Sequence, residues 1–567
     1  MLLIAQLIAP PLQPGPVRLP EVTPGEQGLP RPQDRTSEQD QIQLDLSPEP
    51  PEPDRSPDDD GGVPALFPKV EGSLIYRPEQ LRQIFASCGR STPSATLQAC
   101  AAALSARFEA DGYINTRVYV LGDSIPGALE VVEGRLAEIR VITANPQLSA
   151  RVRRLLRPLQ GTVLNLPALD RQIQYLKRQG GIDLVQGSIG RLGSDVSQAT
   201  LTLWIDPSTD PIRGDLSLRN EGNAGYGQWR AVATMLQNNL LRDNDTLLLY
   251  AEGDMDDTPE LGAVITSLSY VYPLSENFRL NGSFGYSRRN LVEGPLMKEQ
   301  WSFRQFQGYG QLEWVFKESL RQRWYAFGGV SLNRNDSYAS GRPFALLNTL
   351  QDFTTNTGFF RFGVGVNSMS DRSIWSATLY GLQSANGFSY QNQLTSLGNL
   401  GIEPAQATAF GVSAVMAAAI APNASLAVRG AGQIALNPLI EDMGFTIGSD
   451  TGIRGLPGQA VSGDSGYLGS FEIAWSVWQR QRSTVQLVPF VGFGFVNRIR
   501  DIRGSSNFFN DDIGAGGVLA RVITGIGWQI EIGWVSQFNH VDQSGNAIWG
   551  DKFLLGNGVY TNVKYVF

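Results

Sequence analysis

Residues 277–290 read NFRLNGSFGYSRRN, and apolar and polar side chains alternate along them. The even positions carry four large apolar residues: Phe278, Leu280, Phe284 and Tyr286. The odd positions carry four polar residues: Arg279, Asn281, Ser283 and Ser287. A period of two places these two sets on opposite faces of a strand. The stretch therefore predicts a β-strand with one face rich in aromatic side chains.

The same pattern recurs from about Arg213 to Phe567, in about sixteen segments of roughly 10 to 14 residues between turn-rich loops. The last segment alternates in the same way up to the terminal Phe567. In hydrocarbon an open sheet edge would leave backbone groups unpaired, so such a sheet must close. The sequence predicts a transmembrane antiparallel β-barrel of about sixteen strands.

The composition agrees with a barrel and excludes other classes of protein. The 567 residues include 62 glycines and are 10% aromatic, which is typical of outer-membrane barrels. No run of about 18 apolar residues occurs, so no transmembrane helix is predicted. The formal net charge of −8 argues against a nucleic-acid partner, because nucleic-acid proteins need a basic face.

Residues 1–64 hold 14 of the 32 prolines and an acidic run at Asp58–Asp60. This composition cannot bury enough surface to offset its ordering entropy, so it predicts a linker, with one short helix around Ser37 to Leu46. We expect the acidic run to be solvated rather than a calcium site. The N-terminal apolar run is short and lacks a basic region before it, so we expect a truncated or misassigned start of an exported chain.

Residues 65–135 and 136–206 predict two α+β domains with one element order. In the first, a helix follows Pro78, and a second amphipathic helix runs through Leu97 to Phe108 and ends at Gly112. Two strands follow, YINTRVYV (113–120) and GALEVVEGR (127–135). The second domain repeats this with a strand LAEIRVI, helices SARVRRLLRPL and LPALDRQIQYLKRQGG, and strands IDLVQGSIGR and ATLTLWID. Two successive units of about 70 residues are an internal repeat.

The chain has two cysteines, Cys88 and Cys100, both in the first α+β domain. They can form a disulfide in an oxidising compartment. They can equally be two small buried residues on neighbouring helices. The sequence leaves both readings open.

This order of linker, two α+β domains and barrel resembles the outer-membrane transporters of two-partner secretion (TpsB type), the haemolysin and filamentous-haemagglutinin exporters. The resemblance covers about residues 65–567, and four stretches carry it. They are FEADGYINTRVYV…GALEVVEGR (108–135), NEGNAGYGQWRAVATMLQNNLLRDNDTLLL (220–249), IRGLPGQAVSGDSGYLGSFEI (453–473) and VQLVPFVGFGFVN (485–497). It implies two periplasmic polypeptide-transport-associated (POTRA) domains followed by a 16-stranded barrel in the outer membrane.

The resemblance also implies the function of the protein. The POTRA domains hold the N-terminal part of a large unfolded exoprotein, which then passes through the barrel without ATP. An exposed sheet edge suits such a client, because it can add an extended peptide as one more strand. We expect a monomer whose partners are the exoprotein and outer-membrane lipid. An assembly factor of the same superfamily, which inserts barrels into the membrane, is the alternative function; a porin and a barrel enzyme rank below it.

One short loop is the candidate site. Its residues are Ile453, Arg454, Gly455, Leu456, Pro457 and Gly458. In the family that the chain resembles, the loop folds back into the barrel lumen and its arginine pairs with an aspartate in a Phe-x-Asp-x-Gly strand. The matching segment here is FVGFG, with Gly492 at the aspartate position.

Another acidic partner for Arg454 is therefore needed. Alternation places Glu472 and Glu531 on the faces opposite their apolar neighbours, so both point into the lumen. A guanidinium binds a carboxylate through two parallel hydrogen bonds, which fixes geometry as well as charge. We predict that Glu472 or Glu531 tethers Arg454. The alternative is a solvated arginine in an ordinary surface loop.

The sequence predicts no catalytic or cofactor chemistry. His540 is the single histidine, and we place it in a loop. One histidine and two distant cysteines make no zinc site. The stretches GVGV and GFGF precede no helix, so they are not phosphate loops. The segments at 255–264 and 340–358 are predicted to be extracellular loops. We expect a protein that is not an enzyme and that binds neither a cofactor nor a metal.

Overall fold

A computed structural model describes residues 68–540 and 558–567, and these fall into two compact units that divide between residues 209 and 210. Short gaps in the description lie at 74, 87, 89–92, 122–126, 178–181, 193–194, 208–211, 223–224, 243–244, 256–260, 276, 293–299, 346–352, 371, 400, 481–482 and 503–504. The predicted proline-rich linker, the helix around Ser37 to Leu46 and the acidic run at Asp58–Asp60 lie outside the described residues.

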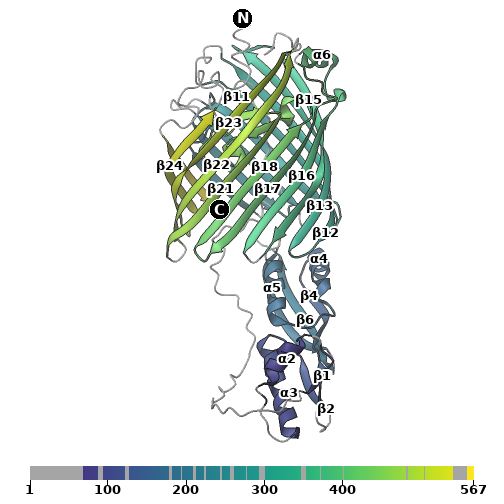
Figure 1. The fold of residues 1–567 in the computed structure, drawn as a ribbon. Coiled ribbons are helices and arrows are strands. Elements are labelled where there is room, and N and C mark those ends of the chain that lie inside the picture. Colours follow the sequence, from purple (N-terminus) through teal and green to yellow (C-terminus); the bar gives the residue numbers. More distant parts are fainter. Residues whose placement is uncertain are drawn as a thin grey trace. The chain divides into compact units, whose positions relative to one another are not determined.

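The first α/β fold packs two helices on a three-stranded sheet (Figure 1). Its elements are β1 (Lys69–Glu71), α2 (Pro78–Phe85), α3 (Pro93–Ala110), β2 (Arg117–Leu121) and β3 (Ala128–Val132). The sheet order is β1-β3-β2, with β1 parallel and β2 antiparallel to the central strand. Leu104, Phe108 and Leu129 are almost completely buried between the helices and the sheet. The apolar spacing of the two helices therefore produces the core that the sequence predicts.

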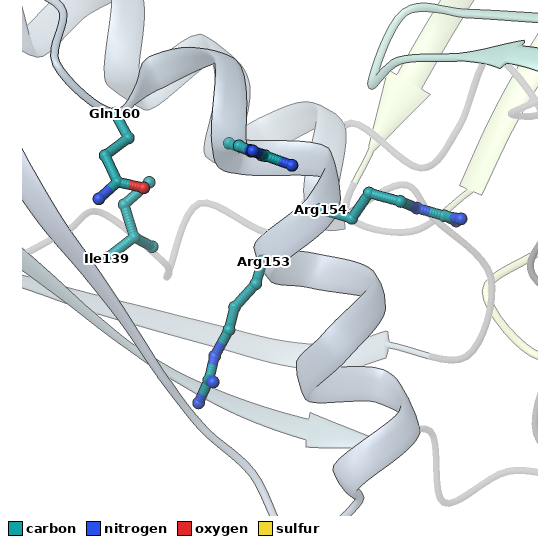
Figure 2. A pocket seen from close by; sticks show the side chains of 5 residues that line it. Ile139, Arg153, Arg154 and Gln160 are labelled. Carbon is teal, nitrogen blue, oxygen red and sulfur yellow. The ribbon is translucent and has the colours of Figure 1, made fainter.

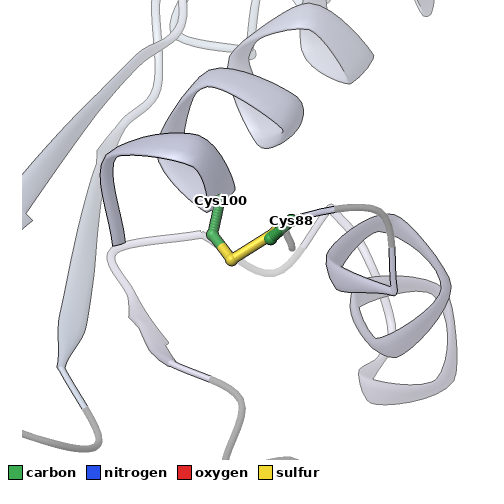
Figure 3. Close-up of a disulfide and its surroundings, with 2 residues drawn as sticks. All are labelled: Cys88 and Cys100. Atoms are coloured by element: carbon green, nitrogen blue, oxygen red, sulfur yellow. A yellow bond between two sulfur atoms is a disulfide. The ribbon is translucent and has the colours of Figure 1, made fainter. Parts of the chain in front are cut away.

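A disulfide between Cys88 and Cys100 ties the end of α2 to the middle of α3, as Figure 3 shows. The Cα atoms of the two cysteines are 5.0 Å apart, and both residues are buried. Of the two open readings, the structure therefore selects the bonded pair. A disulfide closing a loop of this size stabilises a fold by about 3 kcal/mol, in the chain-entropy account.

The second α/β fold repeats the order of the first. Its elements are β4 (Arg135–Ile142), α4 (Pro146–Leu156), the 3₁₀ helix η1 (Arg157–Leu159), α5 (Leu166–Lys177), β5 (Ile182–Leu192) and β6 (Asp195–Pro207). The sheet order is β4-β6-β5, again with one parallel and one antiparallel ladder. The two folds thus share one topology, as expected for an internal repeat.

The first helix of the second fold begins earlier than the sequence predicted. The expected start at Ser149 is wrong, because Asn145 caps the helix four residues upstream of that position. Its side chain accepts hydrogen bonds from the backbone N–H groups of Gln147 and Leu148, and Pro146 takes the first helical position. The α-helix also ends at Leu156, where Pro158 follows and lacks the N–H that would continue it.

Gly112 marks a close approach between the two α/β folds. Its φ is +86°, and a Cβ at this position would lie 2.4 Å from Cδ of Pro167. The Gly112 carbonyl accepts a hydrogen bond from Leu166 N–H, and Asn165 donates to the Asp111 carbonyl. The glycine that ends α3 is therefore also the residue that lets α5 begin against it.

In the described part of the chain, sixteen long antiparallel strands close a barrel (Figure 1). They are β7 (Ile212–Arg219), β8 (Trp229–Asn238), β9 (Thr246–Met255), β10 (Leu261–Pro273), β11 (Phe278–Asn290), β12 (Ser302–Glu318), β13 (Gln322–Ala339), β15 (Thr354–Met369), β16 (Ser373–Ser384), β17 (Thr408–Ala421), β18 (Ala424–Ala435), β21 (Ser465–Arg480), β22 (Ser483–Ile502), β23 (Ser505–Ile523), β24 (Trp528–His540) and β25 (Val559–Val566). The two-residue strand β14 (Arg342–Pro343) pairs beside β13, and β25 pairs with β7 to complete the circle.

The alternation in residues 277–290 corresponds to the two sides of the barrel wall. Phe278, Leu280 and Phe284 are exposed, whereas Ser287 is buried. The outward side chains of β21 and β24 are likewise large and apolar, since Trp475 and Trp534 are among the exposed ones. An exposed apolar belt around a closed sheet is the surface that a barrel presents to lipid.

Three predicted loops are partly strand. The segment 255–264 was predicted to be a loop, but Leu261 already begins β10 opposite Met255. The segment 340–358 likewise enters β15 at Thr354, which pairs with Asp336. His540 is the last residue of β24 and pairs with Asp512, so its assignment to a loop is wrong. Polar residues are compatible with a strand when a neighbouring strand offers paired backbone groups, and single-strand patterns do not show that neighbour.

A short helix, α6 (Gln391–Asn399), interrupts the strand region and was not predicted. It begins at Gln391, after the 3₁₀ turn η3 (Asn386–Phe388) that follows β16. The side chain of Gln393 donates to the Thr354 carbonyl and accepts from Asn356 N–H, which attaches the helix to β15. Only two turns long, it carries too little periodicity to stand out in the sequence.

Candidate functional site

The candidate loop lies in the long connection between β18 and β21. This connection contains a two-stranded sheet of β19 (Phe445–Ile447) and β20 (Val461–Gly463), together with the 3₁₀ helices η4 (Glu441–Met443) and η5 (Ser449–Thr451). The hairpin pairs Phe445 with Gly463 and Ile447 with Val461. Residues 453–458 therefore form the tip of a folded hairpin, which we call the lumenal loop (residues 445–463) on the grounds given next.

The lumenal loop packs against the inner face of the barrel wall. Ile453 and Leu456 have no exposed surface, and they share one apolar cluster with Val488, Phe490 and Val535 of the wall. On β22 and β24 these wall residues alternate with exposed apolar side chains. Because the barrel is closed and its exposed face is apolar, the face that contacts the loop is the lumen.

Arg454 is one of four charged side chains that form a ring. Its Nη1 donates to Glu531 at 2.7 Å and its Nη2 donates to Glu472 at 3.1 Å. Arg521, on β23 between these strands, donates to the other oxygens of Glu472 and Glu531, at 2.6 Å each. Two guanidinium groups and two carboxylates thus alternate, and the ring has no net charge.

Neutral groups complete the site. The Arg454 guanidinium donates to the Tyr560 hydroxyl at 2.7 Å and lies 5.3 Å from the centre of that ring, a cation–π distance. Glu531, with 1% of its side chain exposed, also accepts from Asn562 and Gln529. A buried carboxylate needs such a full set of donors, because an unsatisfied buried charge is strongly unfavourable. Of the two acids in the ring, Glu531 therefore accepts the larger number of hydrogen bonds.

The glycines and proline of the tip make backbone contacts. Gly455 has a φ of +87°, and a Cβ there would lie 2.4 Å from Val535. Its N–H donates to Glu221, and its carbonyl accepts from Gln537. The carbonyls of Pro457 and Gly458 accept hydrogen bonds from the N–H groups of residues 449 and 450. The tip is thus closed on itself and held close to the wall.

Gly492 does not face Arg454 but provides space for the neighbouring residue. A Cβ at Gly492 would lie 2.8 Å from Cγ2 of Ile453, closer than any normal contact. The missing aspartate is therefore matched by an apolar side chain in the space that it would occupy. Glu472, on the adjacent strand β21, and Glu531, on β24, supply the negative charge instead.

Sequence reasoning considered Glu472 and Glu531 as alternatives, and the structure brings Arg454 into contact with both. It missed Arg521 and Tyr560. Arg521 could have been found by the argument applied to the acids, because Val518, Ala520 and Val522 place it on the inward face of β23. Tyr560 could have been found in the same way, since it shares the inward face of the last strand with Asn562 and Lys564.

The second α/β fold carries a small basic hollow. Its lining is Ile139, Arg153, Arg154, Arg157 and Gln160, around a cavity of about 310 Å³. Figure 2 shows Arg153 and Arg154 leaving successive positions of α4 in different directions. The nearest acid on β4, Glu138, already accepts two hydrogen bonds from Arg140, which lowers the pKa of its carboxyl. The arginines lie at the C-terminal end of α4, where the helix dipole favours positive charge.

No described helix is long and apolar enough to cross a membrane. Among the residues that the structure describes, no three His, Cys, Asp or Glu side chains are grouped so as to hold a metal ion.

The fold and the lumenal site define a class of protein: an outer-membrane barrel preceded by POTRA-like α/β folds. Residues 200–501, more than half of the chain, match the sequence profile described as "Haemolysin secretion/activation protein ShlB/FhaC/HecB". The chain belongs to this family of two-partner secretion transporters.

Solved structures agree on the fold. CdiB from Escherichia coli is similar over 91% of this chain and 93% of its own, with a TM-score of 0.58 and 18% identity. CdiB from Acinetobacter baumannii is similar over 89% of this chain and 91% of its own, with a TM-score of 0.53 and 17% identity. No curated protein matches the chain by sequence.

Membership in this family gives the general function. The protein is a transporter of the outer membrane, with its POTRA-like folds in the periplasm, and it exports a partner exoprotein. It is not an enzyme.

Proposed function

We propose that the outer edge of β2 in the first α/β fold binds the partner exoprotein as an extended segment. We assign the fold to residues 65–135, as the first of two POTRA domains that end at 206, after a linker of residues 1–64 and before a barrel of residues 207–567. The transporter works as a monomer and handles an unfolded chain, not a nucleic acid.

The exposure of β2 supports this proposal. The strand lies at the edge of its sheet, and Tyr119, Val120 and Leu121 have 46%, 37% and 41% of their surface exposed. Consecutive apolar residues that are exposed on both faces of an edge strand are a template for another strand. Main-chain hydrogen bonds then give affinity with little dependence on sequence, which suits an unfolded client.

Photo-crosslinking in the full-length transporter tests this contact. A photoreactive amino acid replaces Tyr119 in cells that secrete the exoprotein. Trp204 is the matched control, since it is an equally exposed aromatic residue on the central strand β6, which cannot add another strand. We expect adducts with the N-terminal region of one large exoprotein from position 119 only. Equal adducts from both positions, or adducts with many barrel precursors, would contradict the proposal.

We also propose that the lumenal loop closes the export path at rest and is displaced during export, with Arg454 as its anchor. The ring of Arg454, Arg521, Glu472 and Glu531 supports this, because Arg521 belongs to the wall and stays paired with both glutamates when the loop carries Arg454 away. Five atoms donate to Glu531. When Arg454 leaves with the loop, the other four donors can still hydrogen-bond to Glu531.

A single reporter cysteine measures loop displacement. Both native cysteines are in the disulfide, so Leu456→Cys adds the only free thiol. Leu456 is completely buried, so a maleimide reacts only when the loop opens, and the labelling rate reports the open fraction. We expect Arg454→Gln to raise this rate and to change export. Unchanged labelling and unchanged export in Arg454→Gln would overturn the role of the loop.

A further inference from the structure

A second charged cluster holds the lumenal loop, on a different part of the wall from Arg454. Asp450, four residues before Arg454, accepts a hydrogen bond from Arg230 on β8. Its carboxylate also lies 3.8 Å from Arg219 on β7. Arg230 is buried, with 3% of its side chain exposed, and it is paired with Glu252 on β9 as well. The loop therefore presents an acid to the first strands of the barrel and an arginine to the last ones.

Backbone contacts of the loop connect the same two regions. The Gly455 N–H donates to Glu221, directly after β7, whereas the Gly455 carbonyl accepts from Gln537 on β24. The Gly458 N–H donates to the Gly222 carbonyl at 3.4 Å. Contacts to both ends of the barrel sequence thus come from one short stretch of the loop.

Between these regions lies the seam of the barrel, where β25 meets β7. Five residue pairs form this ladder, from Asp215 opposite Val566 to Arg219 opposite Asn562. The adjacent ladders have seven pairs (β24–β25) and eight pairs (β7–β8), so the seam has the fewest among these neighbours. The lumenal loop therefore lies across the β25–β7 seam, which has fewer residue pairs than either adjacent ladder.

We propose that Asp450 is a second positioning residue, and that Asp450 and Arg454 form two anchors of opposite charge that hold the loop across the seam. The loop leaves the wall only when both anchors open. This inference rests on the proposed role of the loop as a displaceable closure, and it adds the residue that holds its other side. Because the anchors differ in sign, a segment of one charge competes for one anchor and leaves the other in place.

The charges around Arg230 make this anchor testable by a single substitution. Asp450→Asn removes one carboxylate but leaves Arg230 paired with Glu252 and 3.9 Å from Asp254. The wall therefore keeps its own charge pair when the loop loses its acid. Asp450→Glu retains the charge and serves as the conservative variant. Glu403→Gln is the matched control, since it removes an exposed carboxylate from the same barrel at a site away from the loop.

The experiment measures maleimide labelling of Leu456→Cys in the full-length transporter, in six backgrounds: parental, Asp450→Asn, Asp450→Glu, Arg454→Gln, Asp450→Asn with Arg454→Gln, and Glu403→Gln. We expect Asp450→Asn to raise the labelling rate about tenfold or more, as the loss of a charge-assisted hydrogen bond would. The double variant should show about the product of the two single effects, because no described side chain forms an ion pair with both Asp450 and Arg454. Asp450→Glu and Glu403→Gln should label at close to the parental rate.

The outcomes separate the two proposals. If Arg454→Gln raises labelling and Asp450→Asn does not, the second anchor is refuted and the role of the loop stands. If neither changes the rate, the closure role also fails. The shift of the folded barrel on an unheated gel identifies a variant that has not folded. In that case Arg219→Gln, which removes the weaker partner of Asp450, replaces it; we expect a rise of about two- to threefold, and a parental rate would refute the anchor.

Discussion

Gly492→Asp restores an acid at the position where the family pattern carries one, and the structure predicts that it loosens the loop. The first side-chain atom at this position would lie 2.8 Å from Cγ2 of Ile453, which has no exposed surface. Overpacking of this kind costs about 1–3 kcal/mol. The added carboxylate would also give the ring of two arginines and two glutamates a net negative charge.

That free energy converts into a measurable rate. A change of about 1–3 kcal/mol corresponds to roughly a 5- to 150-fold change in an equilibrium constant. We therefore expect maleimide labelling of the Leu456→Cys reporter to rise by a factor in this range in Gly492→Asp. Gly492→Ala, which adds the Cβ without the charge, should give the steric part of the rise alone.

A compensating substitution tests the cause. Ile453→Ala removes the side chain that a Cβ at position 492 would overlap, so Gly492→Ala combined with Ile453→Ala should label no faster than Ile453→Ala alone. This coupling is the signature of two residues in direct contact. The reasoning is refuted if Gly492→Asp slows labelling, or if it restores slow labelling to a Glu531→Gln variant. Either result would mean that Arg454 binds an acid at position 492 more strongly than it binds Glu472 and Glu531.

Three further predictions follow from single contacts. Glu531→Gln removes the buried carboxylate that accepts from both ring arginines, at a cost of about 3 kcal/mol, and should raise reporter labelling about 100-fold, while Glu403→Gln leaves it unchanged. Cys88→Ser removes the disulfide and should lower the free energy of unfolding of the first α/β fold by about 3 kcal/mol, measured by protease cleavage in urea; equal cleavage with and without reductant in the parent would contradict this. Gly112→Ala adds a steric clash to a positive φ, whereas Gly161→Ala adds a side chain at a similar φ (+83°) with no atom within 4 Å. We therefore expect Gly112→Ala to lower stability by more than the roughly 1 kcal/mol of Gly161→Ala in the same assay, and equal losses would refute the close packing at Gly112.

Period-two alternation was sufficient to predict the barrel. It identifies the strands one at a time, because each strand must present one face to lipid and the other to the lumen, whatever its neighbours are. The sidedness of Glu472 and Glu531 came from the same rule. The element order of the α/β repeat could also be predicted from local patterns. Helices such as the one through Leu104 and Phe108 are recognised from the spacing of their own apolar residues. Their ends were less accurate, as at Asn145, because a cap depends on a few backbone hydrogen bonds.

The ring around Arg454 and the anchor at Asp450 were decided only by the tertiary structure. Arg454 reaches Glu531 across 77 positions of the chain, and Asp450 reaches Arg230 across 220. No periodicity carries information over such separations, because the contact depends on how the closed barrel places its first and last strands around one loop. The sequence determined which face each strand turns to the lumen. Closure of the sheet determined which lumenal side chains meet.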